Sequence, residues 1–390
     1  MTVNILWRPI GQVAREDVRW QERTRRSRTT AMPDIAPDDL HAFVRDTCAS
    51  LGSSEVEQGL VADQLVGANL AGHDSHGVGM MPAYVAGAVA GDLRVNEHPE
   101  IVQDSGALVV LDGRQGFGQV TGYEAMNLAI DRAREGGAVI VGLRKSFHIG
   151  RIGHWGEQCA AAGMASLLFV NVMGHSPIVA PYGGRQAKFV TNPVCIAIPG
   201  SLDANGDRPL AMLDMATSTI AAGKARVAFE EGREIPDNAM IDSAGRVTRD
   251  PSGLFDRPRS SALLAMGDHK GSGLAIMAEL VGAALIGGPT MQPGHDRSPT
   301  LVINNMLSIV IDPSATGAAD SFLDEATAYL DYVRDADLRD GFDEILMPGD
   351  PEKRSREKRA AGIPVDDNTL DLLRTCAATA GLDDAESRLR

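Results

Sequence analysis

The chain has 390 residues, which is long for one domain of common size, so we expect two intertwined domains or one large domain with insertions. Its 44% hydrophobic residues, 42 glycines and 4% aromatic residues are typical of an α/β enzyme with a large core. The formal net charge of −15 argues against nucleic acid or an anionic membrane surface as the partner, but allows an anionic substrate at a locally positive site.

The first 33 residues differ in composition from the rest of the chain. They hold seven arginines against three acidic residues and lack the apolar core of a secretory signal. We expect a disordered basic tail over residues 1–33, with a start at Met32 and an organelle transit peptide as alternatives. No apolar run is long enough to span a membrane, and the four cysteines lie far apart. These features predict a cytoplasmic protein with reduced, buried thiols.

In the first half of the chain, amphipathic helical patterns alternate with short apolar runs. A first helix is expected after Pro37, and further helices over residues 55–70, 81–90, 121–135 and 150–162. Buried strands are expected over residues 107–111, 138–141 and 165–172. Apolar strands that alternate with helices indicate an α/β layer structure.

The second half is more irregular and indicates a mixed sheet. Strands are expected over residues 189–198, 210–215, 245–248 and 301–311. Helices are expected over residues 217–230, 271–285, 321–335, 353–359 and 367–380.

A phosphate-binding glycine loop is the usual mark of a nicotinamide enzyme, and the chain has no good match to it. The nearest candidates, Gly116–Gly122 and Gly271–Gly273, have neither the required spacing nor the preceding buried strand. Tight turns and close helix packing explain both better, so a standard Rossmann unit is not predicted.

A polar segment, Ser146–Gly153, lies between a buried strand and a predicted helix. Such junctions present ligand-binding groups in α/β proteins. His148 could exchange a proton near neutral pH from this position, although it could also merely cap the helix.

A second polar segment, Asp74–Gly77, permits a serine nucleophile, a substrate-binding patch or a capped turn. Adjacent serine and histidine rarely pair as nucleophile and base, so we favour substrate binding. The histidines at 73, 76, 148, 154 and 175 show no metal-binding spacing, and we expect no metal. Lys224 and Lys270 could hold an anion or could be ordinary surface lysines.

Taken in order, these segments resemble the malate/L-lactate dehydrogenase family of the type that lacks a Rossmann fold, which includes ureidoglycolate and hydroxycarboxylate dehydrogenases. The resemblance covers about residues 35–385. The segments that carry it are Gly72–Pro82, Ser146–Gly153, Val179–Gly184, Thr191–Pro193, Leu213–Thr217, Gly223–Lys224, His269–Gly271 and Pro348–Gly349.

The resemblance implies an α/β fold with two domains, a homodimer, and an active site near the subunit interface. A mixed-sheet, nicotinamide-binding domain of non-Rossmann topology would span residues 111–317. A helical, α+β domain built from both chain ends would span residues 34–110 and 318–390.

The resemblance also implies roles for particular residues. His148 would exchange the substrate proton, and Ser75 and His76 would contact substrate and nicotinamide. Asn192 would lie near the substrate. NAD or NADP would be lined by His76, Gly150, Arg151, Ile152, Met212, Leu213, Asp214, Met215, Ala216, Thr217, Lys224, Gly267, Lys270, Asn305, Asp350, Pro351, Glu352 and Lys353.

One position departs from the family pattern. Many members carry an arginine that binds the substrate carboxylate where this chain has Met80. Either Arg151 substitutes, or the substrate is larger and less polar beside Met80. The Gly79–Pro82 segment resembles the hydroxycarboxylate branch, which favours the second option.

The sequence therefore predicts hydride transfer between NAD(P) and a 2-hydroxy or 2-oxo carboxylic acid. The alternative is a metal- or serine-dependent amidohydrolase that uses the histidine-rich segments.

Overall fold

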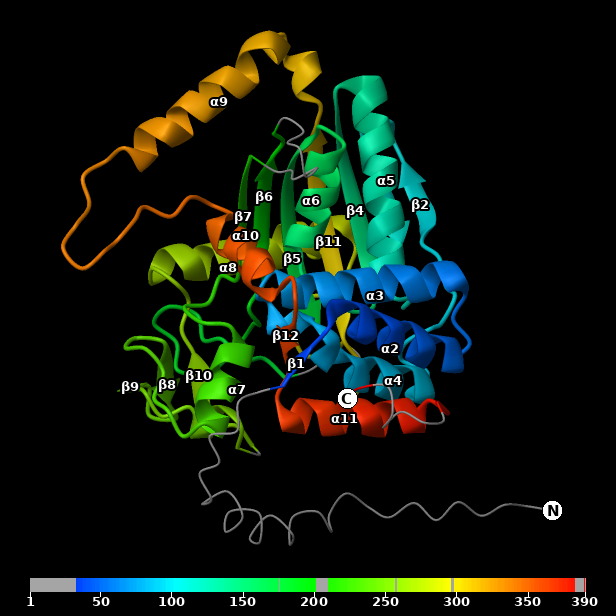
Figure 1. Ribbon diagram of the computed structural model, residues 1–390, viewed down its shortest axis with the longest axis vertical. Coiled ribbons are helices and arrows are strands. Elements are labelled where there is room, and N and C mark those ends of the chain that lie inside the picture. Colours follow the sequence, from blue (N-terminus) through cyan, green and yellow to red (C-terminus); the bar gives the residue numbers. More distant parts are fainter. Residues whose placement is uncertain are drawn as a thin grey trace, which may run out of the picture.

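A mixed sheet of seven strands forms the centre of the computed structural model, which describes residues 33–174, 176–200, 210–256, 258–295, 298–382 and 389 (Figure 1). The strand order is β2-β3-β4-β11-β5-β6-β7. Only β3 and β4 pair in parallel, and the other five ladders are antiparallel. The strands are β2 (Glu100–Asp104), β3 (Leu108–Asp112), β4 (Ala138–Ser146), β5 (Ala165–Met173), β6 (Val194–Ile198), β7 (Ala211–Met215) and β11 (Ile303–Ile311). The predicted α/β fold with a mixed sheet is confirmed.

Helices cover both faces of this sheet because successive side chains in the strands point to opposite sides. Val139, Val141 and Leu143 of β4 pack under α5 (Gly118–Gly136) and α6 (Gly153–Ala161). Ile140 lies on the other face, in the cluster under α8 (His269–Gly282) and the short helix η5 (Ala284–Ile286). The near-continuous apolar strands in the sequence reflect this burial on both sides.

A layer of four helices lies below one end of the sheet and contains both ends of the described chain (Figure 1). It consists of α2 (Pro37–Ser50), α3 (Glu55–Leu70), α4 (Met81–Ala90) and α11 (Asp367–Thr379). Leu40 and Leu65 share one buried cluster with Leu370 and Leu373. The two-stranded sheet of β1 (Asp34–Ile35) and β12 (Ile363–Pro364) joins the chain ends beside it.

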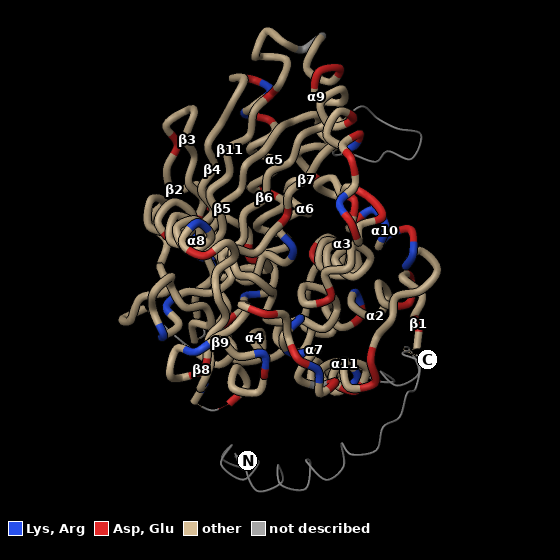
Figure 2. The backbone as a smooth tube through the Cα atoms, turned by 90° about the vertical axis from the view of Figure 1, so that its left-hand side faces the viewer, with Lys and Arg blue, Asp and Glu red and all other residues tan. Residues whose placement is uncertain are grey.

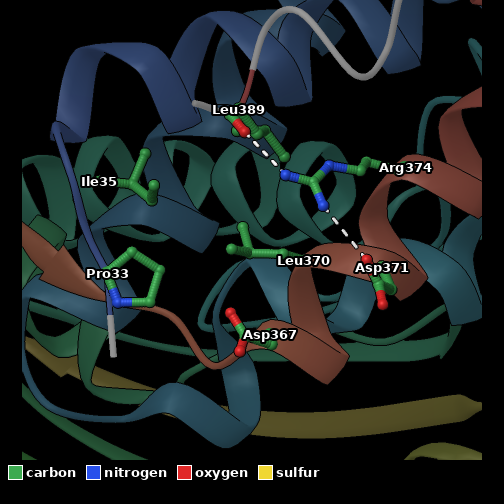
Figure 3. Close-up of a pocket in the computed structure, with 7 residues that line it drawn as sticks. All are labelled: Pro33, Ile35, Asp367, Leu370, Asp371, Arg374 and Leu389. Carbon is green, nitrogen blue, oxygen red and sulfur yellow. Dashed lines mark hydrogen bonds and ion pairs between the residues drawn. The ribbon is translucent and has the colours of Figure 1, made fainter. Parts of the chain in front are cut away.

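A pocket of about 450 Å³ lies between these chain ends, and Figure 3 shows the residues that line it. Arg374 crosses it, donating from Nη1 to Asp371 and from Nη2 to the carbonyl oxygen of Leu389. None of the predicted site residues lines this pocket.

A third cluster of buried residues lies beside the central sheet. It joins α8 to the three-stranded sheet of β8 (Met240–Asp242), β9 (Val247–Thr248) and β10 (Ser261–Leu263), and to α7 (Ala222–Glu230). An isolated bridge from Val179 to Leu263 ties this sheet to the segment after β5.

Two later helices complete the chain. The basic helix α10 (Asp350–Arg359) lies against α3, as Figures 1 and 2 both show. Helix α9 (Ala319–Arg334) projects from the end of the molecule opposite to α11 (Figure 1). No side chain from 321 to 346 is buried.

Most predicted elements are present, but several bounds differ. Helix α7 begins at Ala222 rather than 217, and the short strands β1, β8, β10 and β12 were not predicted. Helix α6 begins at Gly153 rather than 150, and β6 begins at Val194 rather than 189. Strand β2 was not predicted because all five of its residues are exposed, so its sequence lacks the alternation of a half-buried strand.

The two-domain division stays a prediction, and some of its expected bounds do not coincide with the ends of elements. The expected boundary at residue 110 falls inside β3, and β2 also belongs to the central sheet. Helix α9 lies apart from the helical layer to which it was assigned (Figure 1). The predicted basic tail lies outside the described residues, apart from Pro33, and so does His175. No helix in the described part of the chain is long and apolar enough to cross a membrane.

Candidate active site

His148 lies in the loop between β4 and α6, and both of its neighbours anchor that loop. Phe147 is fully buried and Ile149 almost so, and His148 itself is 9% exposed. Gly150 has a φ of +69°, and a Cβ there would lie 1.8 Å from Oε1 of Gln64, so only glycine fits. Helix α6 is capped by Ile152 without a side-chain bond. The helix-cap alternative for His148 is therefore wrong.

Ser75, His76 and Met80 lie on two short 3₁₀ helices, η2 (Asp74–His76) and η3 (Val78–Met80), between α3 and α4. The Asn69 side chain holds this turn, accepting from Val78 N at 2.8 Å and donating to Asp74 Oδ1 at 2.7 Å. A Cβ on Gly77 would lie 2.1 Å from Asn69 Oδ1. The glycine after His76 is thus required by close packing.

The two predicted histidines meet although 72 positions separate them. The rings of His76 and His148 are stacked, with centroids 5.6 Å apart and planes 13° from parallel. Ser75 Oγ lies 3.0 Å from Nδ1 of His76, and the hydroxyl of Tyr84 lies 2.7 Å from Nδ1 of His148. Burial, with the nearby charges of His73 and Arg151, lowers the pKa of His76 to about 4. His76 is therefore neutral near pH 7.

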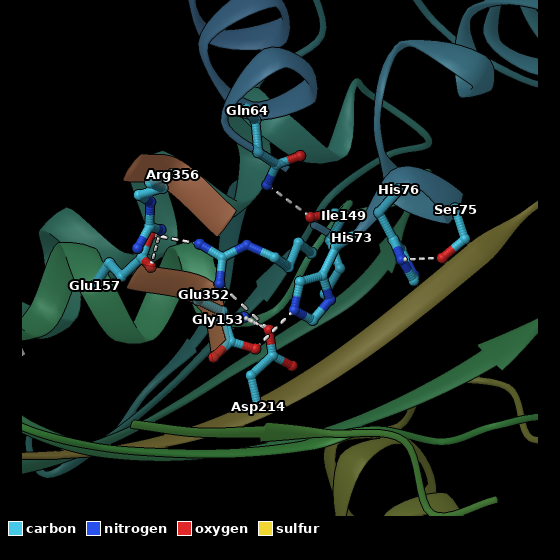
Figure 4. A network of polar contacts seen from close by, with 11 residues as sticks. Gln64, His73, Ser75, His76, Ile149, Gly153, Glu157, Asp214, Glu352 and Arg356 are labelled. Carbon is cyan, nitrogen blue, oxygen red and sulfur yellow. Dashed lines mark hydrogen bonds and ion pairs between the residues drawn. The ribbon is translucent and has the colours of Figure 1, made fainter. Parts of the chain in front are cut away.

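Segments expected to line a cofactor converge near His76 (Figure 4). Asp214 of β7 accepts from Gly153 N at 3.0 Å, and Met212 N donates to Pro348 O at 3.0 Å. His73 Nε2 lies 2.9 Å from Glu352 Oε1, which ties the start of α10 to the turn before Ser75. Met266 N donates to Thr217 O at 2.9 Å, bringing Gly267 beside the same region.

Comparison with known proteins assigns the chain to a family. The sequence model for malate/L-lactate dehydrogenase matches residues 35–374, most of the chain. The chain belongs to the malate/L-lactate dehydrogenase family.

Its relatives are dehydrogenases named for hydroxy acids. Hydroxycarboxylate dehydrogenase B of Escherichia coli K12 is 43% identical over 88% of this chain and 93% of its own. L-Lactate dehydrogenase of Cupriavidus necator is 40% identical over 76% of this chain and 83% of its own. A solved E. coli structure, described as a candidate malate/lactate dehydrogenase, superposes with a TM-score of 0.86 at 40% identity, covering 91% of this chain and 98% of that one.

Membership of a dehydrogenase family leaves the amidohydrolase alternative without support. Among the residues that the structure describes, no group of three or more His, Cys, Asp or Glu side chains could hold a metal ion. Ser75 lies against its own neighbour His76, the arrangement least typical of a nucleophile and its base.

Arg151 does not lie as a carboxylate-binding residue would. It is 3% exposed, and its guanidinium contacts Glu157 and Asp214. Burial opposes its charge, but these two carboxylates raise the pKa of Arg151, and it stays ionised. Its charge is already paired on two sides, so the structure speaks against Arg151 as the substitute for the arginine missing at position 80.

Asp214 and Glu157 respond differently to the shared arginine. Burial raises the pKa of Asp214 more than Arg151 lowers it. Glu157 is half-buried, but it contacts both Arg151 and Arg356, and together they lower the pKa of Glu157. The network joins α6, β7 and α10 behind the site (Figure 4).

Not all of the remaining residues that were predicted to line the cofactor lie at the site. Gly223 packs against Ser75, which brings the exposed Lys224 to the edge of the site. Lys270 and Lys353 are also exposed. Asn305 is not brought to the site: it is fully buried and bonds to Lys145 N, Asn171 Oδ1 and Pro289 O. Its amide holds the strands in place, which does not support its predicted contact with cofactor.

Sequence reasoning missed Tyr84, Gln119 and Gln64, which connect to His148. All three are buried polar residues on helices α4, α5 and α3. A tyrosine or glutamine on the apolar face of a helix needs a hydrogen-bond partner, and that mismatch is the one signal that could have marked them.

Proposed function

We propose that this protein transfers a hydride between NAD or NADP and a 2-hydroxy or 2-oxo carboxylic acid. The observation that carries the proposal is the stacked pair of His76 and His148 beside the converging segments at Gly150–Gly153, Met212–Thr217 and Pro348–Glu352. A buried, polar-lined junction of this kind suits proton exchange next to a bound cofactor.

The described residues fit a nicotinamide cofactor. Asn192 is fully buried and donates from Nδ2 to Ala275 O and to Glu279, while its Oδ1 has no partner in the described structure. The backbone carbonyl of Asn192 accepts from the Thr217 hydroxyl, so Asn192 adjoins one of the converging segments. A carboxamide N–H, such as nicotinamide carries, would satisfy this acceptor.

In the proposed reaction the nicotinamide supplies or accepts the hydride when bound. His148 exchanges the proton with the substrate oxygen, and Ser75 and His76 position the substrate and the nicotinamide ring. Burial holds His76 neutral, so it adds no positive charge beside His148.

The substrate proposal follows from Met80. This side chain is partly buried against the helical core and offers no charge to a carboxylate. We therefore infer a hydroxycarboxylate that is larger and less polar than malate. Similarity to the E. coli protein named hydroxycarboxylate dehydrogenase B supports this choice.

A panel assay tests class, cofactor and substrate together. Purified protein is mixed with NADH or NADPH and a series of 2-oxo acids, and oxidation is followed at the nicotinamide absorbance. We expect turnover, and we expect His148→Ala to abolish it while cofactor affinity stays within about threefold. Turnover that survives in His148→Ala would remove His148 from the chemistry, and no turnover with any acid would contradict the proposal.

We also infer that the protein is a homodimer in the cytoplasm. The segment from 321 to 346 exposes five large apolar side chains: Tyr329, Tyr332, Leu338, Phe342 and Leu346. An exposed apolar set of this size on a projecting element fits a second copy of the chain.

A further inference from the structure

A chain of hydrogen bonds runs from the backbone of the catalytic loop through three helices and back to His148. Gln64 Nε2 donates to Ile149 O at 2.8 Å, and Gln119 Nε2 donates to Gln64 Oε1 at 2.9 Å. Gln119 Nε2 also donates to the oxygen of Tyr84 at 2.8 Å. The Tyr84 hydroxyl in turn lies 2.7 Å from Nδ1 of His148.

The carbonyl of Ile149 sets the direction of this chain. A carbonyl only accepts, so the nearer end of Gln64 must be its NH₂ and the farther end its oxygen. That oxygen requires the NH₂ of Gln119, whose second hydrogen then points to Tyr84. Since the Tyr84 oxygen already accepts from Gln119, its own hydrogen is directed to His148.

Tyr84 keeps this hydrogen. Its side chain is fully buried, and burial raises the pKa of Tyr84 well above its ordinary value. Gln119 cannot reverse the chain by turning its amide, because its oxygen would then face the oxygen of Gln64. The Oε1 atom of Gln119 has no partner in the described structure, as expected if the two donor contacts fix the amide.

We propose that Tyr84 is a positioning residue that holds neutral His148 as the tautomer with its hydrogen on Nε2. In this tautomer Nδ1 accepts from Tyr84, and the opposite edge of the ring carries an N–H donor.

A donor at Nε2 favours one substrate form over the other. It can bond to the carbonyl oxygen of a 2-oxo acid directly. A 2-hydroxy acid that gives up its hydroxyl proton needs a lone pair at Nε2, so the hydrogen must first move to Nδ1. This consequence rests on the proposed function, whereas the tautomer itself does not.

The tautomer can be measured without cofactor or substrate. Nitrogen-15 labelling of histidine in the full-length protein distinguishes a ring nitrogen that carries hydrogen from one that does not, and the His148 signals are those lost in His148→Asn. We expect Nε2 to carry the hydrogen at neutral pH. A hydrogen on Nδ1 of the neutral wild-type ring would overturn the proposal.

Two variants test whether Tyr84 determines the tautomer of His148. Tyr84→Phe removes the donor, so the His148 signals should move toward a mixture of both tautomers. Gln119→Glu keeps the size. Its buried carboxyl would donate one hydrogen to the Gln64 oxygen and present an acceptor oxygen to Tyr84, so Tyr84 should turn toward it and the His148 hydrogen should shift to Nδ1. Tyr123→Phe, on the exposed surface of α5, is the control and should change nothing. Signals that are unchanged in both test variants would contradict a role for Tyr84.

Binding measurements test whether the site prefers a 2-oxo acid over a 2-hydroxy acid. With NADH bound, we expect wild-type protein to bind oxamate, a non-reacting 2-oxo analogue, more tightly than L-lactate. Tyr84→Phe should reduce that preference at least threefold, and an unchanged preference would contradict the consequence. If the tautomer is as proposed but the protein oxidises neither NADH nor NADPH with any acid, the proposed function fails and the positioning role stands.

Discussion

The sequence resemblance implies that Met80 stands where an arginine would bind the substrate carboxylate, and the structure offers no substitute from Arg151, whose guanidinium contacts Glu157 and Asp214. We predict that Met80→Arg lowers the KM for pyruvate or oxaloacetate at least tenfold. A tenfold change corresponds to about 1.4 kcal/mol, below the full value of a bidentate charged contact.

Steady-state kinetics with the same acids checks this prediction. Met80→Leu keeps the side chain apolar and serves as the control, with KM values close to wild type. An unchanged KM in Met80→Arg would mean that the carboxylate binds elsewhere.

His154 couples stability to pH without belonging to the site. Its ring packs edge-on against Trp155, with centroids 5.0 Å apart. Burial lowers the pKa of His154 to about 4 from an ordinary value of 6.5, with Glu157 opposing and Arg151 assisting. As pH falls from about 6.5 toward 4, His154 therefore becomes protonated in the unfolded chain but stays neutral in the folded chain. The free energy of unfolding decreases over this range.

We predict that His154→Gln loses less free energy of unfolding between pH 7 and pH 5 than the wild type does. The difference should be about 1–2 kcal/mol, from the pH interval over which only the unfolded histidine is protonated. Urea unfolding at both pH values measures it. His98→Gln, whose ring is exposed, is the control, and an equal pH dependence in His154→Gln and the wild type would contradict the argument.

At the scale of single residues, the sequence singled out His148, His76 and its neighbour Ser75 as candidates, but not the residues that bond to His148. A polar segment at a strand-to-helix junction and a resemblance to a family were enough to propose both histidines as site residues. Gln64 and Gln119 lie on different helices, and nothing in one sequence tells which buried amide meets which hydroxyl. The sequence also could not show that two carboxylates, Glu157 and Asp214, already pair with the Arg151 guanidinium.

At the scale of elements, helix α5 approaches the His148 loop so closely that one glycine sets the distance. A Cβ on Gly118 would lie 2.2 Å from the carbonyl oxygen of His148 and 2.5 Å from Cα of Ile149. These are backbone atoms and cannot turn aside. We predict that Gly118→Ala destabilises the protein by about 1–3 kcal/mol and lowers kcat about tenfold or more.

Urea unfolding and steady-state kinetics test both effects. Gly136→Ala, on the same helix with nothing within 4 Å of its added Cβ, is the matched control and should stabilise by about 0.5–1 kcal/mol. Equal stability in Gly118→Ala and Gly136→Ala would show that the loop can shift away from α5.

Element boundaries followed from the sequence only where local pattern and tertiary packing agree. Helix α3 has its Ser54 cap and α11 its Asp366 cap, and both were predicted within one or two residues. Helix α6 was placed three residues early, because the polar loop before it contains no residue that excludes a helix. Strand β2 has five exposed residues and exists through its pairing with β3, which no local pattern reveals.

At the scale of the whole molecule, the site depends on segments from the entire chain. The helical layer is complete only when α11 packs against α4. Helix α10, from the same end of the sequence, contacts the site through the pair of His73 and Glu352. A resemblance spanning the chain could indicate this arrangement, whereas strand and helix patterns alone could not give the order of the strands. The segment before α10, residues 321–346, contributes no buried side chain to this arrangement.

Helix α9 within that segment exposes two tyrosines. Tyr329 and Tyr332 are 63% and 76% exposed, and their rings lie side by side on α9 with centroids 6.4 Å apart. If a second copy covers them, the wild type should have the mass of two chains by size exclusion with light scattering. The double variant Tyr329→Asp/Tyr332→Asp should fall toward the mass of one chain, because two buried carboxylates would face an apolar partner. Val56→Asp, at an exposed apolar position on α3, should leave the mass unchanged. A wild type with the mass of one chain would contradict the homodimer, and an unchanged double variant would place its interface away from α9.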